Sequence, residues 1–188
     1  MSVQLPLISK LFKFFEDRID PFPSVDPSMP PKGLWPFFRH YAKGSEKQLG
    51  ILAFCSISLA IIEVALFGAI GFLVDWMTKS TPGTFLQEYW VQLTAITFAL
   101  LIILPSIIVI YSLVLHQGLL GNLPMRIRWL GHRYLLKQSV GFYAEDFAGR
   151  VATKLMQTAL YLRDSVIKGC GVLLHISVSF VSVLILLA

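Results

Sequence analysis

Glu63, His116 and His175 are ionisable side chains that lie inside otherwise apolar segments of the sequence. A carboxylate at the centre of a bilayer costs about 2.5 to 3.5 kcal/mol on membrane-insertion scales, so Glu63 must face the protein interior, pair with another group or be protonated. It either handles a substrate or a proton, or else makes a structural hydrogen bond or lies near a cavity wall. The two histidines either line a transport pathway or pack between helices.

Recognisable catalytic motifs are absent from the sequence. There is no phosphate-binding loop of the form GxxxxGK[ST], and the GxGxxG, HExxH, CxxC and GxSxG patterns are also missing. Cys55 and Cys170 lie in apolar segments without the spacing of a metal site or a disulfide framework. We therefore expect no catalytic, cofactor-binding or metal-binding residue, and these 188 residues cannot hydrolyse ATP by themselves.

The composition is that of an integral membrane protein. Hydrophobic residues make up 55% of the chain and charged residues 14%, and the mean hydropathy is +0.69. The apolar residues occur in blocks longer than a globular core helix needs. We predict an all-α, multi-pass fold with spans at about 49–77, 90–119 and 167–188.

The basic residues indicate the topology of these spans. Of the 16 Lys and Arg residues, seven precede the first span, eight follow the second, and only Lys79 lies in the loop between them. Because basic residues concentrate on the cytoplasmic side, we expect a cytoplasmic N-terminus and a cytoplasmic central segment in the cell (inner) membrane. The excess of positive charge thus reflects topology, and we expect no nucleic-acid partner.

The N-terminal part divides into three segments. Residues 1–20 carry apolar side chains at helical spacing opposite charged ones, which predicts an amphipathic helix on the bilayer or on a partner, or else a mobile arm. Residues 21–33 contain five prolines and form a linker. From Leu34 to Tyr41 aromatic and basic residues mix, as they do at the headgroup level of a membrane.

The second and third spans continue as helices beyond the bilayer. A helix from Trp90 to Gln138, with a kink expected at Pro105, would be about 70 Å long, against a hydrocarbon core of about 30 Å. On the return segment Val151, Leu155, Thr158, Leu162 and Val166 repeat at helical spacing. Two such helices joined by a short tip form a lever that can transmit force to the membrane.

The polar segment from Ser139 to Val166 joins these two helices. It contains an aromatic pair at Phe142 and Tyr143, an acidic pair at Glu145 and Asp146, and Gly149, which we expect to break the helix before a new one starts at Arg150. The order and spacing of these residues, with Lys154 and Leu162-Arg163-Asp164, resemble the first intracellular loop of ABC exporter transmembrane domains.

The resemblance implies a fold and a function. Residues 34–188 would form part of a six-helix transmembrane domain, truncated after an elbow helix and three long spans, with a coupling loop at about 120–166. The implied partners are a nucleotide-binding domain in cis or in trans, which would bind ATP and Mg²⁺, a second subunit in a homodimer or heterodimer, and the lipid bilayer. Its contacts with the ATPase domain would come from the loop tip: Phe142, Tyr143, Ala144, Glu145, Asp146, Phe147, Gly149 and Arg150.

Several features leave alternatives open. Many exporters carry an Asn-Asp or similar pair near the position of Gln157 and Thr158, and its absence leaves the subfamily and cargo open, although the apolar spans favour a lipid or an amphipathic drug-like molecule. The chain stops at Ala188 within an apolar run, so we expect it to be the N-terminal part of a longer protein. The other readings are the membrane input region of a receptor or sensor kinase and a small non-enzymatic membrane scaffold.

Overall fold

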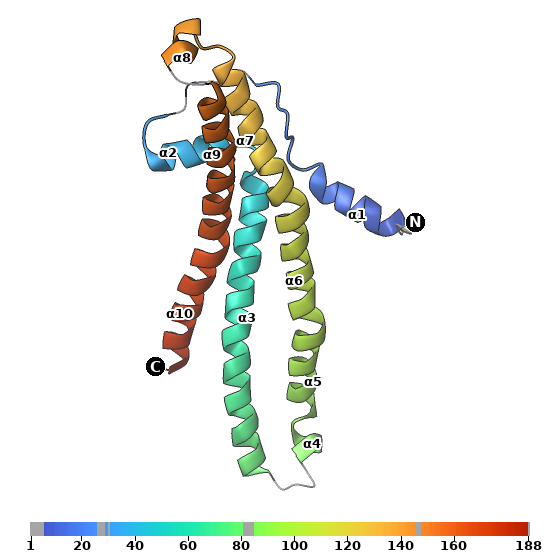
Figure 1. Ribbon diagram of the computed structural model, residues 1–188. Coiled ribbons are helices and arrows are strands. Elements are labelled where there is room, and N and C mark those ends of the chain that lie inside the picture. The colour runs from blue at the N-terminus through green and yellow to red at the C-terminus, as the bar shows by residue number, and fades with distance from the viewer. Residues whose placement is uncertain (1–5, 26–28, 30, 81–84, 146–147, 188) are drawn as a thin grey trace. The chain divides into compact units, whose positions relative to one another are not determined.

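The computed structural model describes residues 6–25, 29, 31–80, 85–145 and 148–187, and the regular elements in these ranges are all helical. Figure 1 shows the helices with their labels. Their bounds in chain order are α1 Pro6–Glu16, α2 Leu34–Ala42, α3 Glu46–Lys79, α4 Phe85–Glu88, α5 Trp90–Phe98, α6 Leu104–Leu113, α7 Leu120–Leu135, α8 Val140–Glu145, α9 Ala148–Lys168 and α10 Leu174–Leu187. Three π-helical segments interrupt them: η1 Ala99–Ile103, η2 Val114–Leu119 and η3 Gly169–Leu173.

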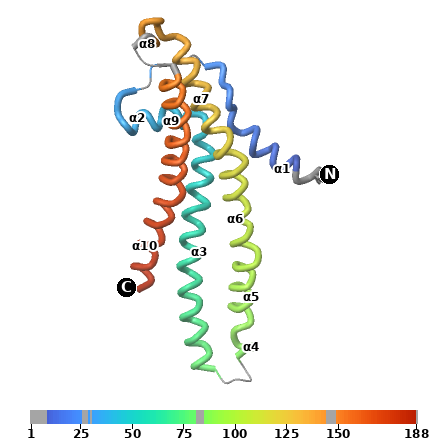
Figure 2. Tube along the Cα trace, viewed as in Figure 1, coloured from blue at the N-terminus to red at the C-terminus, as the bar shows by residue number. Residues whose placement is uncertain are grey.

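Among the described residues, three continuous helices are long and apolar enough to cross a membrane. They run over Glu46–Lys79, Trp90–Leu135 and Gly149–Leu187, with 34, 46 and 39 residues. Figure 2 traces each of them as an unbroken coil. The two longer helices extend over about 70 Å and 60 Å, roughly twice a hydrocarbon core. The predicted all-helical, multi-pass character is thus present, and each helix extends beyond its apolar stretch.

Two of the π-helical segments, η1 and η2, precede a proline. Pro105 has no backbone N–H and would clash with the carbonyl group of residue 101, and η1 ends two residues before it. Pro124 lies inside α7, and η2 ends five residues before it. The expected disturbance at Pro105 is therefore absorbed as a widened turn within a continuous helix.

The chain forms two compact units, each built from separated stretches of sequence. The first contains residues 1–52 and 112–170, and its interior is formed by side chains that are at most 1% exposed: Ile19, Leu52, Val114, Leu119 and Leu123. These residues come from the N-terminal segment, the start of α3 and the η2–α7 region. The N-terminal segment thus supplies part of this unit's core.

The second unit contains residues 53–111 and 171–188. Here α3 and α10 approach closely at Gly68, where an added Cβ would lie 3.2 Å from Leu186 Cδ1. A glycine that lets helices approach is the usual packing device within membranes. Trp76 near the end of α3 stacks on Tyr89 with 4.9 Å between ring centroids, which ties the C-terminal end of α3 to the start of α5.

Candidate functional site

Helices α7 and α9 pack against each other and carry the segment that resembles a coupling loop. Leu123 and Ile127 of α7 and Val151 and Leu162 of α9 are at most 8% exposed. The buried stripe of α9 passes through Ala159, which is fully buried, whereas Thr158 is exposed. Both positions fit a helical spacing, and Ala159, the smaller and less polar of the two neighbours, is the one that faces inward.

Gly131 sets how closely the two helices approach. A Cβ added there would overlap Cδ1 of Leu155, so the Leu155 side chain occupies the space that any larger residue at position 131 would need. The leucine of one helix thus fits directly over the backbone of the other. This contact lies one turn before the end of α7 and close to the loop tip.

At the tip, α8 turns the chain between the two helices (Figure 1). Tyr143 Oη donates a hydrogen bond of 2.7 Å to the carbonyl oxygen of Leu135, the last residue of α7. The rings of Phe142 and Tyr143 meet edge to face with centroids 5.3 Å apart. Because the Tyr143 hydroxyl group is engaged inside the tip, Phe142, 40% exposed, is the freer of the two aromatic side chains for a partner.

The remaining predicted contact residues divide into two groups. The backbones of Ala144 and Glu145 belong to α8, while Asp146 and Phe147 lie outside the described residues. Gly149 and Arg150 lie in the first turn of α9, which begins at Ala148, so the helix includes Gly149 rather than starting after it. Glycine costs a helix about 1 kcal/mol in its interior through backbone entropy, and a position in the first turn lies outside that interior.

Arg163 ties α9 to α7 rather than facing solvent alone. Its guanidinium group lies 2.7 Å from Asp164 Oδ1, and its Nη1 donates a bond of 3.5 Å to the carbonyl oxygen of Leu120. The side chain is 21% exposed. Arg150 and Lys154, in contrast, are exposed on α9.

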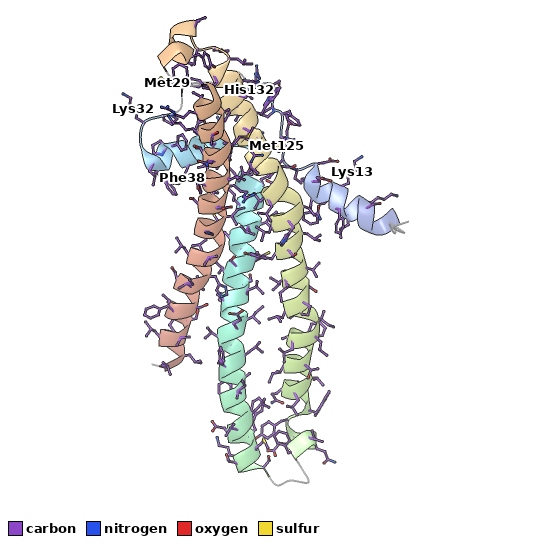
Figure 3. The ribbon with its side chains drawn as sticks, in the orientation of Figure 1. Lys13, Met29, Lys32, Phe38, Met125 and His132 are labelled. Carbon is purple, nitrogen blue, oxygen red and sulfur yellow. The ribbon has the colours of Figure 1, made fainter. Side chains whose placement is uncertain are left out.

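Residues 16–25, which we call the N-terminal strap, are held along α7 by hydrogen bonds from side chains to backbone carbonyl groups. Asn122 donates to Glu16, Arg126 to Asp20, Trp129 to Pro23, and Arg133 to Pro23 and Val25, over 2.7 to 3.4 Å. The donors are three or four residues apart and therefore share one face of α7. Figure 3 shows the side chains of α7, with Met125 and His132 labelled.

The sequence pattern had suggested only part of the strap. Two of its donors, Arg126 and Arg133, are visible in the sequence as basic residues after the second span, but the acceptors are backbone carbonyl groups, which leave no trace in residue types. The edge-to-face contact between Phe22 and Trp129, with centroids 5.4 Å apart, was a possible signal, because an aromatic side chain within a proline-rich linker needs an apolar partner.

In the second unit, Glu63 of α3 and His175 of α10 lie together. His175 Nε2 is 3.3 Å from Glu63 Oε2, and His175 Nδ1 is 3.3 Å from the carbonyl oxygen of Ser56. A carbonyl oxygen only accepts, so Nδ1 carries a hydrogen in this arrangement. The remaining proton then lies either on Nε2, giving an imidazolium–carboxylate pair, or on Glu63, giving a neutral pair.

His116 belongs to the other unit and bonds within its own helix. Its Nδ1 is 3.0 Å from the carbonyl oxygen of Ser112 and 3.3 Å from Ser112 Oγ. Such a contact across one helical turn is local and does not need a pathway. Of the three predicted intramembrane residues, Glu63 and His175 are therefore the pair that the structure brings together.

The chain is similar to a protein that is named an uncharacterised ABC transporter ATP-binding protein in Haemophilus influenzae. The two are 38% identical over 178 residues, which cover 94% of this chain and 28% of that protein. The chain thus spans a little over a quarter of the length of its relative. No protein-family model and no solved structure matches the chain.

Proposed function

We propose that this chain forms part of the transmembrane domain of an ABC exporter and couples that domain to an ATPase through the α7–α8–α9 segment. The membrane-length helices and the similarity to a protein named as an ABC transporter component support this proposal. The observation that carries it is the tip itself: α8 is tied through Tyr143 to the end of α7, while α7 and α9 interlock at Gly131 and Leu155. A force on α8 would therefore reach both long helices.

The proposed partner is a nucleotide-binding domain, on the same polypeptide or another, that binds ATP with Mg²⁺. Phe142 would insert into a groove of that domain, since large aromatic side chains contribute most of the binding energy in small interfaces. Two subunits would form the transporter, with the N-terminus and α8 on the cytoplasmic side. The proposed cargo is a lipid or another amphipathic molecule, in keeping with the apolar spans.

The experiment is to replace Phe142 by alanine in the full-length protein and to measure transport and cargo-stimulated ATP hydrolysis in proteoliposomes. We expect both to fall at least tenfold while ATP binding is retained. Tyr161→Ala is the matched control, because it removes an aromatic side chain that is 67% exposed on α9 away from the tip. Unchanged transport and stimulation in the Phe142→Ala variant, with α8 still folded, would rule out the tip as the coupling element.

A further inference from the structure

A pocket of about 570 Å³ lies in the first unit, between the end of α1, the first turns of α3 and η2. It is lined by Phe14, Phe15, Arg18, Gly44, Glu46, Lys47, Gln48, Ile51 and Val114. Its α1 wall is held in place by backbone proximity, because a Cβ added at Gly118 of η2 would lie 3.6 Å from the carbonyl oxygen of Phe15. The strap, whose first residue ends α1, is bonded to α7 at Glu16 and Asp20, on either side of Arg18.

The lining has a polar part and an apolar part. Arg18 and Lys47 are exposed basic side chains, and Arg18 Cζ lies 4.2 Å above the centre of the Phe14 ring. Within the described part of the chain, neither basic residue forms an ion pair. Phe14, Phe15, Ile51 and Val114 form the apolar part. With Glu46 included, the lining carries two positive charges and one negative charge.

The α3 residues that line the pocket indicate its depth in a membrane. Glu46 and Lys47 are the first residues of α3, and its mainly apolar part follows from Leu49 onward and includes Ile51. The pocket therefore lies where a membrane-length helix passes from charged to apolar residues, which is the level of lipid headgroups. The free backbone N–H groups in the first turn of α3 add partial positive charge at the same place.

We propose that this pocket binds one anionic phospholipid. Arg18 and Lys47 hold the phosphate group, and Phe14, Phe15, Ile51 and Val114 contact the upper part of an acyl chain. A soluble anion would leave the apolar wall unused, and a purely apolar ligand would leave two unpaired cations beside it. A phospholipid at headgroup depth fits both parts of the lining, because its phosphate group is anionic and its acyl chain is apolar.

The test is native mass spectrometry of the full-length protein in detergent, titrated with phosphatidylglycerol or phosphatidylcholine. We expect one tightly retained phosphatidylglycerol per chain. The variant Arg18→Gln/Lys47→Gln should bind it about 25-fold more weakly, at about fivefold for each basic residue near an anionic headgroup. The matched control Lys10→Gln/Lys13→Gln removes the same charge from exposed positions of α1 outside the pocket and should change binding less than twofold (Lys13 is labelled in Figure 3).

A second variant, Ile51→Trp, fills the apolar part without changing the charge and should also weaken binding. The melting temperature of each variant is also measured in lipid-free detergent. A variant that melts as the unchanged protein does but binds less lipid has lost binding and not folding. Equal losses in the two double variants would show diffuse surface attraction and overturn the proposal. So would competition by inorganic phosphate at the lipid's own concentration, or tighter binding of phosphatidylethanolamine that depends on Glu46.

Discussion

The hydroxyl group of Tyr143 donates a hydrogen bond to the carbonyl oxygen of Leu135 across 2.7 Å, and so closes the end of α7 with a side chain from the following helix. The Leu135 carbonyl oxygen also accepts a bond of 2.9 Å from the backbone N–H of Gln138, so the tyrosine hydroxyl group is its second donor. The bond also fixes the direction in which α8 leaves α7. Tyr143 thus holds α8 to the end of α7, and Phe142 beside it remains exposed.

Tyr143→Phe should loosen the tip without unfolding the protein. One neutral hydrogen bond contributes about 1 kcal/mol, which corresponds to about fivefold faster amide exchange within α8. Hydrogen–deuterium exchange over residues 140–145 measures this change. Tyr161→Phe is the control, and equal protection of α8 in both variants would show that the bond does not hold the tip.

Gly131→Ala and Gly121→Ala should differ although both add one methyl group to α7. Gly121 has open space around its Cα, so alanine there should stabilise the helix by up to about 1 kcal/mol. At Gly131 the methyl group meets Leu155, and the overlap should cost about 1 to 3 kcal/mol. Thermal unfolding in detergent measures both, and Leu155→Ala should relieve the Gly131→Ala variant. Equal melting temperatures for the two single variants would contradict the close approach.

Arg126→Gln should release the N-terminal strap. The charged donor to Asp20 is lost, and exchange of the amides at residues 17–25 should rise about tenfold. Arg128→Gln removes the same charge from α7, but Arg128 Nη1 contacts Met125 Sδ rather than the strap. If both variants leave the strap equally protected, the arginine bond is dispensable.

Glu63 and His175 should show thermodynamic coupling. Glu63→Gln and His175→Gln each leave the other polar group without its native partner, so the double variant should cost less than the sum of the singles by about 0.5 to 3 kcal/mol. Thermal unfolding of the four proteins in lipid nanodiscs gives this energy. Pairing either substitution with His116→Gln should give additive effects, since His116 bonds within its own helix.

Tyr41 should ionise late. Burial in α2, followed by the nearby Tyr134, raises the pKa of Tyr41 above its usual value of 10.0. The folded state therefore holds the phenolic proton more tightly than the unfolded state, so this contribution to stability is intact below the unfolded pKa and is lost as pH rises through the folded one. Tyrosinate absorbance should show a late-titrating component that Tyr41→Phe removes. If Tyr41→Phe keeps the whole of this late absorbance change, the late titration belongs to another tyrosine.

Hydrophobic pattern alone was enough to predict the helical, membrane-spanning class. An apolar environment, whether lipid or a neighbouring helix, selects apolar residue types and can therefore be read from a sequence. The uncharged run that starts at Tyr89 and the helical pattern from Val151 are two examples. Helix continuity through Pro105 was also predictable, because a proline within a membrane helix bends the ladder without ending it.

Contacts between distant segments could not be predicted. Glu63 and His175 are far apart in sequence, and nothing in either apolar segment specifies which faces meet. The strap depends on carbonyl groups that every residue has, so only its donors on α7 were visible. Thr158 and Ala159 show the same limit on a smaller scale, since a period of 3.6 residues permits either one to face inward.

The π-helical segment η1 has a consequence for how this chain can change in length. Its widened turn holds one residue more than an α-helical turn would, next to Pro105. Deleting one residue within Ala99–Ile103 would restore a regular turn and leave both flanking helices hydrogen-bonded. Because the turn would still complete about one revolution, the helices on either side would keep nearly the same faces toward their neighbours, whereas a deletion from a regular α-helical stretch would rotate one part by about 100°.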